Sequence, residues 1–258
     1  MAEASGEERR NIWGVLGGRI FFLGDQLAPN GLEYKPLFSL DTELNFWFWR
    51  EQRVYGFVET RFWGQRAGPG VTNPKQGAFD FSKRELDLNV GTAWNYSGPF
   101  EFRAFAYSFN NLNRGDSSFS PAGYNDGVGL ENRWYFAGNY EDMGLARFDV
   151  TRTSFIGLGY YPTKVMTDEK GNDFKPGLFL HGRVNYDLKG ESWYLYADSQ
   201  FICKRAGSAK YLFLDTGTAI RPFARNTRLE YRFGTDNKYD FELKRFDTEV
   251  YLSLRLTF

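Results

Sequence analysis

The sequence contains little of what most enzymes and disulfide-stabilised proteins depend on. Cys203 is the single cysteine and His181 the single histidine among 258 residues. One thiol excludes an intramolecular disulfide, and one thiol with one histidine excludes a cysteine–histidine zinc site. No phosphate-binding loop or HExxH motif occurs, and no apolar run approaches the roughly 18 residues of a membrane-spanning helix. We therefore expect no catalytic residue, no metal and no cofactor, and a protein that is not an enzyme.

An excess of charge of either sign is also missing. The 32 basic and 32 acidic residues cancel, so a nucleic-acid partner is not expected. Aromatic residues, in contrast, make up 19% of the chain, although the mean hydropathy is only −0.52. The two values agree if each strand has one apolar face and the rings gather at the bilayer interfaces.

The last stretch of the chain, 246–258, alternates without an error. One face is apolar apart from a threonine: Phe246, Thr248, Val250, Leu252, Leu254, Leu256 and Phe258. The other face is polar apart from a tyrosine: Asp247, Glu249, Tyr251, Ser253, Arg255 and Thr257. Because residues two apart on a strand share a face, this pattern is typical of an edge strand of a soluble sandwich or of a lipid-facing strand of a closed barrel.

The whole chain divides into alternating runs of about 10–15 residues. We expect strands at 12–24, 37–50, 53–66, 82–96, 100–112, 127–139, 145–161, 177–188, 192–204, 209–221, 225–235 and 241–258. The first, third, fifth and seventh gaps are long and rich in turn-forming residues: 25–36, 67–81, 113–126 and 162–176. The gaps between them are short: 51–52, 97–99, 140–142 and 189–191.

Long loops on one side, tight turns on the other and an even number of strands are typical of a bacterial outer-membrane barrel. We predict an all-β fold, a single transmembrane antiparallel up-and-down β-barrel of about 12 strands, with long extracellular loops and short periplasmic turns. It forms one domain over 1–258, with 1–11 as a periplasmic tail. We expect a monomer in the bacterial outer membrane, surrounded by lipid and lipopolysaccharide, with its native signal peptide removed and replaced by Met1.

The seventh expected strand, 145–161, breaks the alternation. Keeping Phe148 and Val150 outward also places Arg152 outward, and an arginine facing lipid near the midplane costs about 2–4 kcal/mol. A β-bulge near Arg152 or two shorter strands would restore the alternation.

Acidic and basic residues recur two positions apart on the face that must turn inward. They are Glu59 and Arg61, Glu101 and Arg103, Glu131 and Arg133, in the reverse order Arg147 and Asp149, and near the end Arg228, Glu230 and Arg232. On the eighth strand His181 and Arg183 also fall on the inward face. Neighbours across strands lie within about 5 Å, so these groups can form ion pairs. Two interpretations stay open: a salt-bridge network that fills the lumen, or the lining of a narrow wet pore. His181 has no serine two residues on, so we expect a histidine held by lumen partners.

Aromatic residues fall on the same inward face. They are Trp47, Trp49, Tyr55, Phe57, Trp63, Phe105, Tyr107, Tyr135, Tyr194, Tyr196 and Tyr211. Rings among carboxylates and guanidinium groups suit a ligand with an apolar face and hydroxyl edges, such as a nucleoside or a sugar. Packing of rings near the strand ends is the alternative.

Two local patterns are similar to known families. The alternating last strand with its final Phe258 resembles the terminal strand of bacterial outer-membrane proteins, which implies recognition of Phe258 by the assembly machinery. The stretches 133–140, 142–144 and 157–159, with 55–59 and 62–64, resemble the nucleoside-specific channels of the outer membrane, which are twelve-stranded barrels. This resemblance implies passive nucleoside passage along Tyr55, Phe57, Glu59, Arg133 and Tyr135. The spacing from 139 to 142 is one residue shorter than the family's, which leaves the substrate open.

The sequence thus predicts an outer-membrane channel for passive diffusion of a small polar solute, with nucleosides as the candidate solute. The alternatives are a channel for acidic oligosaccharides and a non-conducting structural or assembly barrel. The expected lining residues are Tyr55, Phe57, Glu59, Arg61, Glu101, Arg103, Glu131, Arg133, Tyr135, His181 and Arg183.

Overall fold

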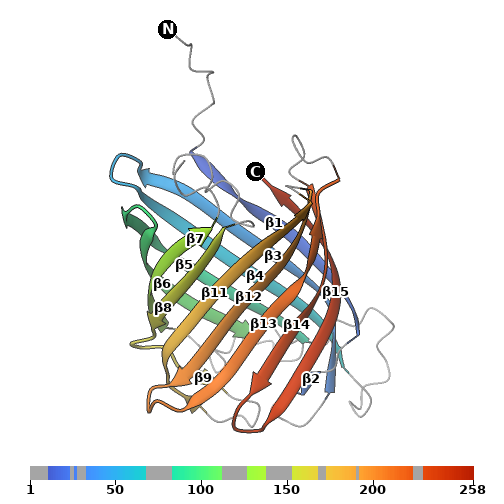
Figure 1. Ribbon diagram of the computed structural model, residues 1–258. Coiled ribbons are helices and arrows are strands. Elements are labelled where there is room, and N and C mark those ends of the chain that lie inside the picture. Colours follow the sequence, from blue (N-terminus) through green and yellow to red (C-terminus); the bar gives the residue numbers. More distant parts are fainter. Residues whose placement is uncertain are drawn as a thin grey trace.

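Twelve long β-strands form a closed antiparallel barrel in the computed structural model (Figure 1). The structure describes residues 11–23, 26–27, 33–67, 83–111, 127–137, 153–167, 173–189, 192–222 and 229–258. The barrel strands are β1 (Ile12–Leu23), β3 (Glu33–Trp49), β4 (Val54–Ala67), β5 (Lys83–Ser97), β6 (Phe100–Asn111), β7 (Gly127–Ala137), β8 (Ser154–Tyr160), β11 (Pro176–Lys189), β12 (Trp193–Lys204), β13 (Ala209–Ile220), β14 (Leu229–Asp240) and β15 (Arg245–Thr257). Three two-residue strands complete the set: β2 (Gln26–Leu27), β9 (Met166–Thr167) and β10 (Asp173–Phe174).

Closure of the barrel joins the first strand to the last. Each long strand pairs with the next along the chain, and β1 pairs with both β3 and β15. The backbone of Gly14 exchanges hydrogen bonds of 3.0 and 3.1 Å with that of Phe258. Because a closed barrel satisfies its ladder hydrogen bonds without a free edge, this seam allows the sheet to sit in lipid. No helix in the described part of the chain could span a membrane.

The two faces of the wall confirm the predicted alternation. On β15, Leu252, Leu254 and Leu256 are exposed on the outside, whereas Tyr251 and Ser253 are buried within the barrel. Exposed aliphatic and aromatic side chains also cover the outer faces of the other strands, which is how a barrel meets lipid. Near the strand ends beside the chain termini the exposed groups are mostly aromatic: Phe48, Trp49, Trp94, Tyr96, Phe100, Trp134, Tyr186 and Trp193. Such a girdle is typical of the level where hydrocarbon gives way to water.

The seventh expected strand begins later than predicted. The strand expected at 145–161 is β8, which begins at Ser154, and its ladder with β7 starts at Ala137 opposite Ser154. The tight turn expected at 140–142 lies outside the described residues. Arg152, with the β-bulge expected beside it, also lies outside the described residues. Arg147 and Asp149 lie outside the described residues, as does the tail 1–10.

The eleventh strand is also displaced from its expected place. We expected this strand at 225–235 and the last strand at 241–258. Instead β14 covers Leu229–Asp240 and the turn falls at 241–244. The side chain of Asp236 faces the lumen, where it contacts Arg19, and Asn237 donates a hydrogen bond to the carbonyl oxygen of Leu214. These partners stabilise polar residues inside a strand.

Candidate functional site

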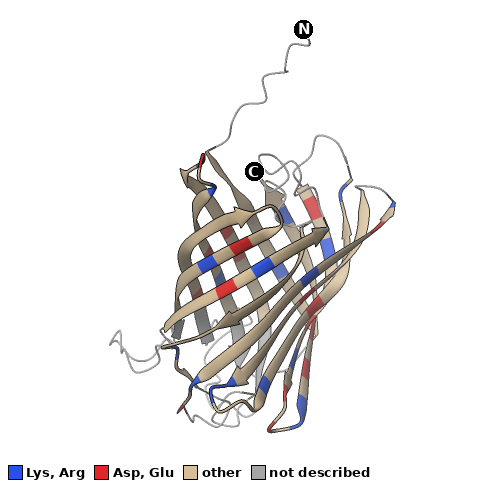
Figure 2. Cartoon of the chain, turned by 60° about the vertical axis from the view of Figure 1, so that its left-hand side comes forward, with Lys and Arg blue, Asp and Glu red and all other residues tan. Residues whose placement is uncertain are grey.

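All eleven expected lining residues lie on the inner side of the wall, on β4, β6, β7 and β11. Figure 2 shows basic and acidic positions side by side on neighbouring strands. Two-residue spacing fixes which side chains share a face, and antiparallel pairing then places Glu101 opposite Arg133 and Arg103 opposite Glu131. The sequence-predicted set is therefore brought together, with Arg61 as the exception described below.

The carboxylate of Glu101 lies between two phenol groups. The hydroxyl of Tyr55 donates to its Oε2 at 2.8 Å, and the hydroxyl of Tyr135 donates to its Oε1 at 2.9 Å. Glu101 is fully buried. Hydrogen bonds to both oxygens compensate a carboxylate for the loss of water, so these two predicted tyrosines hold a charge in place.

Two arginines of the predicted set form ion pairs with predicted acids. Nη2 of Arg103 lies 2.7 Å from Oε1 of Glu59, and Nη2 of Arg133 lies 2.9 Å from Oε2 of Glu131. The first pair reaches from β6 past β5 to β4. Sequence spacing alone identified the faces of these residues but not this choice of partners.

His181 joins the acids of neighbouring strands. Its Nδ1 lies 3.1 Å from Oε1 of Glu131, and its Nε2 lies 3.3 Å from Oδ1 of Asp198. Nε of Arg183 donates to the other oxygen of Asp198 at 2.7 Å. The imidazole also meets the ring of Phe155 edge-on at 4.8 Å between centroids. His181 is thus held by lumen partners, as the sequence predicts.

A second charged cluster, which we call the Arg19 cluster, was not predicted. The guanidinium of Arg19 contacts Asp41 at 2.8 Å, Asp215 at 2.9 Å and Asp236 at 3.3 Å. Arg61, predicted as a neighbour of Glu59, instead donates to Asp41 at 2.7 Å. The inward position of Arg19 follows from alternation on β1, but three of its partners come from β3, β13 and β14. The predicted up-and-down order already places β1 beside β3, but nothing in the local sequence indicates that side chains of β13 and β14 reach Arg19.

A third set of charges surrounds Glu230 inside the barrel. Glu230 receives hydrogen bonds from Arg221, Arg232 and Tyr194. All four residues are buried, and the guanidinium of Arg232 also lies 4.4 Å from the ring centre of Tyr196. This part of the lumen, lined by β12, β13 and β14, is filled by a satisfied network.

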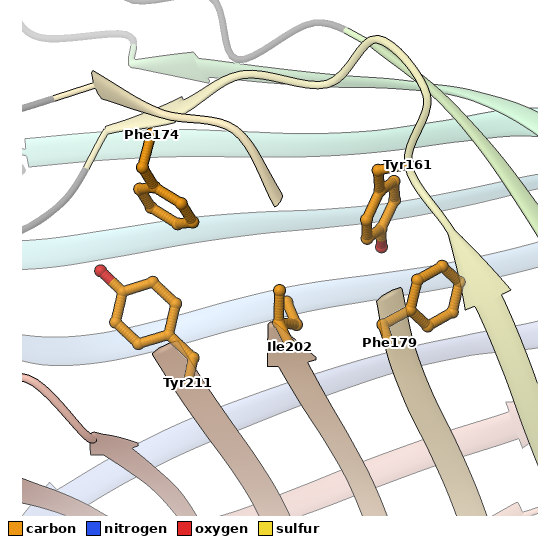
Figure 3. Packing of buried hydrophobic residues seen from close by; sticks show 5 residues of the cluster. All are labelled: Tyr161, Phe174, Phe179, Ile202 and Tyr211. Carbon is orange, nitrogen blue, oxygen red and sulfur yellow. The ribbon is translucent and has the colours of Figure 1, made fainter. Parts of the chain in front are cut away.

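Aromatic side chains pack inside the barrel end opposite the termini (Figure 3). Phe174 of β10 points from the connection between β8 and β11 toward Tyr211, with ring centres 5.8 Å apart. Tyr161, just after β8, stacks on Phe179 at 4.5 Å. Lys164 of the same connection is buried with its Nζ 3.4 Å from the ring centre of Tyr107. This connection therefore folds inward and narrows the lumen.

A small cavity lies nearer the termini, among the predicted residues. Its volume is about 30 Å³. One water molecule needs roughly 10–15 Å³, so the cavity has space for about two. Its lining combines charged, polar and aromatic side chains: Trp13, Glu43, Asn45, Tyr55, Arg103, Arg133, Tyr135, Thr153, Phe155 and Arg183. Five of the eleven expected lining residues meet here.

Two predicted aromatic positions differ from expectation. Phe57 points inward, but it is only 1% exposed and the guanidinium carbon of Arg103 lies 3.6 Å from its ring centre. A solute could stack on Phe57 only after Arg103 moved. Trp49, expected inside, is exposed on the outside, because the register between β3 and β4 shifts between Trp47 and Trp49.

No cluster of potential metal ligands occurs among the described residues.

Comparisons with known proteins add little to this geometry. No family model and no curated protein matches the chain. Among solved structures, a chain from a study of the in-meso crystallization of membrane proteins is 10% identical, with a TM-score of 0.47 and coverage of 95% of this chain and 84% of that one. The transport unit of the autotransporter AIDA-I from Escherichia coli is 11% identical, with a TM-score of 0.37 and coverage of 100% and 93%. A triple mutant of the Rhodopseudomonas blastica porin is 9% identical, with a TM-score of 0.31 and coverage of 96% and 99%.

Proposed function

We propose that the chain is a bacterial outer-membrane channel for passive diffusion of small polar solutes. The observation that carries the proposal is a group of charged side chains inside the barrel that are not fully buried. Four inward charged side chains on β4, β11 and β12 remain between 24% and 35% exposed: Glu59, Arg61, Arg183 and Asp198. Charged groups that stay exposed inside a barrel hold water there, and a hydrated path is what passive diffusion requires.

The width of the path limits what can pass. The cavity accepts only about two water molecules, and the connection between β8 and β11 narrows the opposite end. Water and small ions therefore pass first. For a larger solute we propose nucleosides, supported by the sequence resemblance and by the ring of Tyr135 in the cavity lining. Passage of a nucleoside requires ion pairs such as that of Arg103 with Glu59 to separate.

A sealed barrel with a structural or assembly role is the second candidate. It is favoured by the buried network around Glu230, in which Tyr194 donates to Glu230 and Arg232 donates to Tyr194. Breaking a buried ion pair by removing one partner typically costs about 3–5 kcal/mol, so that side of the lumen does not open readily. An acidic oligosaccharide as solute has no comparable observation in its favour.

Conductance in a planar lipid bilayer tests the proposal. We expect the purified barrel to give small, ohmic current steps, and nucleosides at millimolar concentration to reduce them. Tyr135→Ala should weaken this block by about 5-fold to 100-fold, because stacking of a base is worth about 1–3 kcal/mol. Tyr135→Phe keeps the ring and removes the hydroxyl that donates to Glu101, so it should retain the block. A correctly folded barrel that conducts nothing supports the sealed barrel instead.

A further inference from the structure

Two tyrosine rings at the barrel end opposite the termini enclose one amine. Nζ of Lys164 lies 3.4 Å from the ring centre of Tyr107 and 4.3 Å from that of Tyr161. Lys164 and Tyr161 are both buried. A cation over a ring face is attracted by the electron density of the ring, most strongly where water is excluded. The two rings therefore form an aromatic cage, the Tyr107–Tyr161 cage, which a side chain of the same protein occupies.

Both rings of the cage are held by residues behind them. The hydroxyl of Tyr107, on β6, donates to Oδ1 of Asp87 at 3.2 Å. The ring of Tyr161 stacks on Phe179 with 4.5 Å between the ring centres. The hydroxyl of Tyr161 accepts a hydrogen bond from Gln200 at 3.3 Å. None of these contacts involves the amine, so the cage keeps its shape when its occupant leaves.

The backbone beside the cage is anchored as well, so only one side chain has to move. Oγ1 of Thr163 accepts a hydrogen bond from the backbone N–H of Val128 at 3.0 Å. A Cβ atom at Gly127 would lie 2.3 Å from Cα of Lys164, so the glycine allows this close contact with β7. Thr163 is exposed, and solvent thus lies one residue away from the cage. Rotation of the flexible four-carbon chain of Lys164 is enough to vacate it.

The cage suits a cation that has no N–H groups. Among the described residues, none accepts a hydrogen bond from Nζ of Lys164 or forms an ion pair with it. A buried amine without acceptors is destabilised, and burial lowers the pKa of Lys164 to about 7. A quaternary ammonium ion has no donor to satisfy and keeps its charge at every pH. The charge of Asp87 favours the protonated form of Lys164, and so favours a cation at this position.

We propose that the Tyr107–Tyr161 cage binds a small quaternary ammonium ion, such as tetramethylammonium or choline, in exchange for the side chain of Lys164. The lysine is an internal competitor that fills the cage until the ligand arrives. Both rings lie inside the barrel, so the ligand is a soluble ion and not a lipid headgroup of the surrounding membrane. The inference goes beyond the proposed function and does not depend on conductance.

Titration calorimetry with the purified barrel in a maltoside detergent, which has no ammonium group, tests the cage. We expect saturable binding of tetramethylammonium and of choline by the wild-type protein. A neutral alcohol with a tert-butyl group has the shape of choline without its charge, and it should bind about tenfold more weakly or not at all. Tyr107→Leu removes one ring and should weaken tetramethylammonium binding by about tenfold or more. Tyr107→Phe retains the ring and should retain the binding.

A gain of affinity provides the second arm of the test. Lys164→Ala removes the internal competitor and should tighten tetramethylammonium binding by about tenfold, because the ligand no longer depends on a minor state in which the cage is empty. A misfolded variant cannot give this result. Lys189→Ala changes an exposed lysine at the end of β11 and should bind as the wild type does.

Four outcomes overturn the proposal. They are no saturable binding by the wild type, equal affinity of the wild type and Tyr107→Leu, unchanged affinity in Lys164→Ala, and binding that appears only in Lys164→Ala. In the last case the substitution itself has created the cavity.

Discussion

Asn89 and Val90 are neighbours on β5 whose side chains meet opposite environments. The carboxamide of Asn89 donates to Oε2 of Glu59 in the lumen at 3.2 Å, whereas Val90 is 44% exposed on the outer surface. Both residues lie at the middle of the strand Lys83–Ser97. One position in the sequence thus separates a polar interior from a lipid-facing exterior.

This relationship predicts unequal costs for the same new charge. Val90→Arg should destabilise the membrane-inserted barrel by about 2–4 kcal/mol, because a guanidinium then faces lipid near the midplane. Asn89→Arg places the guanidinium beside Glu59 and should cost less than about 1 kcal/mol. Urea unfolding from lipid vesicles measures both. Equal costs for the two variants would show that the assignment of inner and outer faces is incorrect.

Gly157 predicts a steric requirement at the centre of the charged site. A Cβ atom at Gly157 would lie 2.3 Å from Oε1 of Glu131, the oxygen that meets His181. Gly157→Ala should therefore destabilise the barrel by roughly 1–3 kcal/mol, because the carboxylate must move from its partners. Gly182→Ala on the neighbouring β11 is the control, since a Cβ there is 3.4 Å from the nearest atom. Thermal unfolding of both variants gives the comparison.

Lys164 predicts a dependence of stability on pH. Burial lowers its pKa from the ordinary 10.5 to about 7, while the charge of Asp87 acts in the opposite direction. Between pH 7 and about 10.5 the unfolded chain holds a proton that the folded barrel has released, so the unfolding free energy rises with pH through this window. Lys164→Met removes this contribution. The unfolding free energy of the variant should exceed that of the wild type most at pH 7, and this difference should shrink toward pH 10.

The control for Lys164→Met replaces a lysine that is exposed. Lys189→Met changes an exposed lysine at the end of β11 and should alter the pH profile little. Tryptophan fluorescence during urea unfolding at pH 7, 8.5 and 10 follows all three proteins. A constant difference between wild type and Lys164→Met at the three pH values would mean that Lys164 is protonated equally in the folded and unfolded states.

Charge selectivity should follow the exposed lumen residues and not the buried ones. Asp198→Asn removes an acid that is 31% exposed and should move the reversal potential in a salt gradient toward anion preference. Arg61→Gln should move it toward cations. Glu230→Gln, within the packed network, should lower stability and leave the reversal potential unchanged. If Glu230→Gln shifted the reversal potential as much as Asp198→Asn, the ions would have to pass through the packed network and not along the exposed lumen residues.

Phe258 combines two separable roles at the seam. Its backbone exchanges two hydrogen bonds with Gly14, and its ring is the expected signal for the assembly machinery. Deleting Phe258 should slow both refolding into lipid vesicles and insertion in cells. Phe258→Ala keeps the backbone bonds, so it should refold normally in vesicles and insert poorly in cells. Normal insertion of Phe258→Ala in cells would show that the assembly machinery does not recognise the ring.

Alternation was sufficient to predict the strand order and the inner face of all eleven expected lining residues. It works because each strand separates lipid from a polar lumen, so an error of one residue would expose charge to lipid. It failed at 145–161 and 225–235, where local turn residues and one arginine gave conflicting signals. Asp236 shows why: its partner Arg19 lies 217 residues earlier, and no local rule indicates that an aspartate has such a partner.

The side-chain contacts inside the lumen could not be predicted from the sequence either. Spacing places Phe57 and Arg103 on the inner side, but only the closed barrel brings the guanidinium onto the ring. The inward fold of the connection between β8 and β11 depends on Phe174 reaching Tyr211, and these residues lie on segments that alternation treats separately. Faces follow from local periodicity, whereas contacts across a barrel depend on its circumference and stagger.

The Arg19 cluster has a consequence for the order of events during assembly. Arg19 belongs to β1 and its partner Asp41 to β3, while Asp215 and Asp236 arrive only with β13 and β14. A chain emerging from its amino terminus carries this cation with one of its three acids until nearly the whole sheet exists. Completion of the ion cluster therefore coincides with ring closure, and a barrel lacking its last strands retains an incompletely compensated charge in its wall. Arg19 thus favours the finished ring over every shorter intermediate.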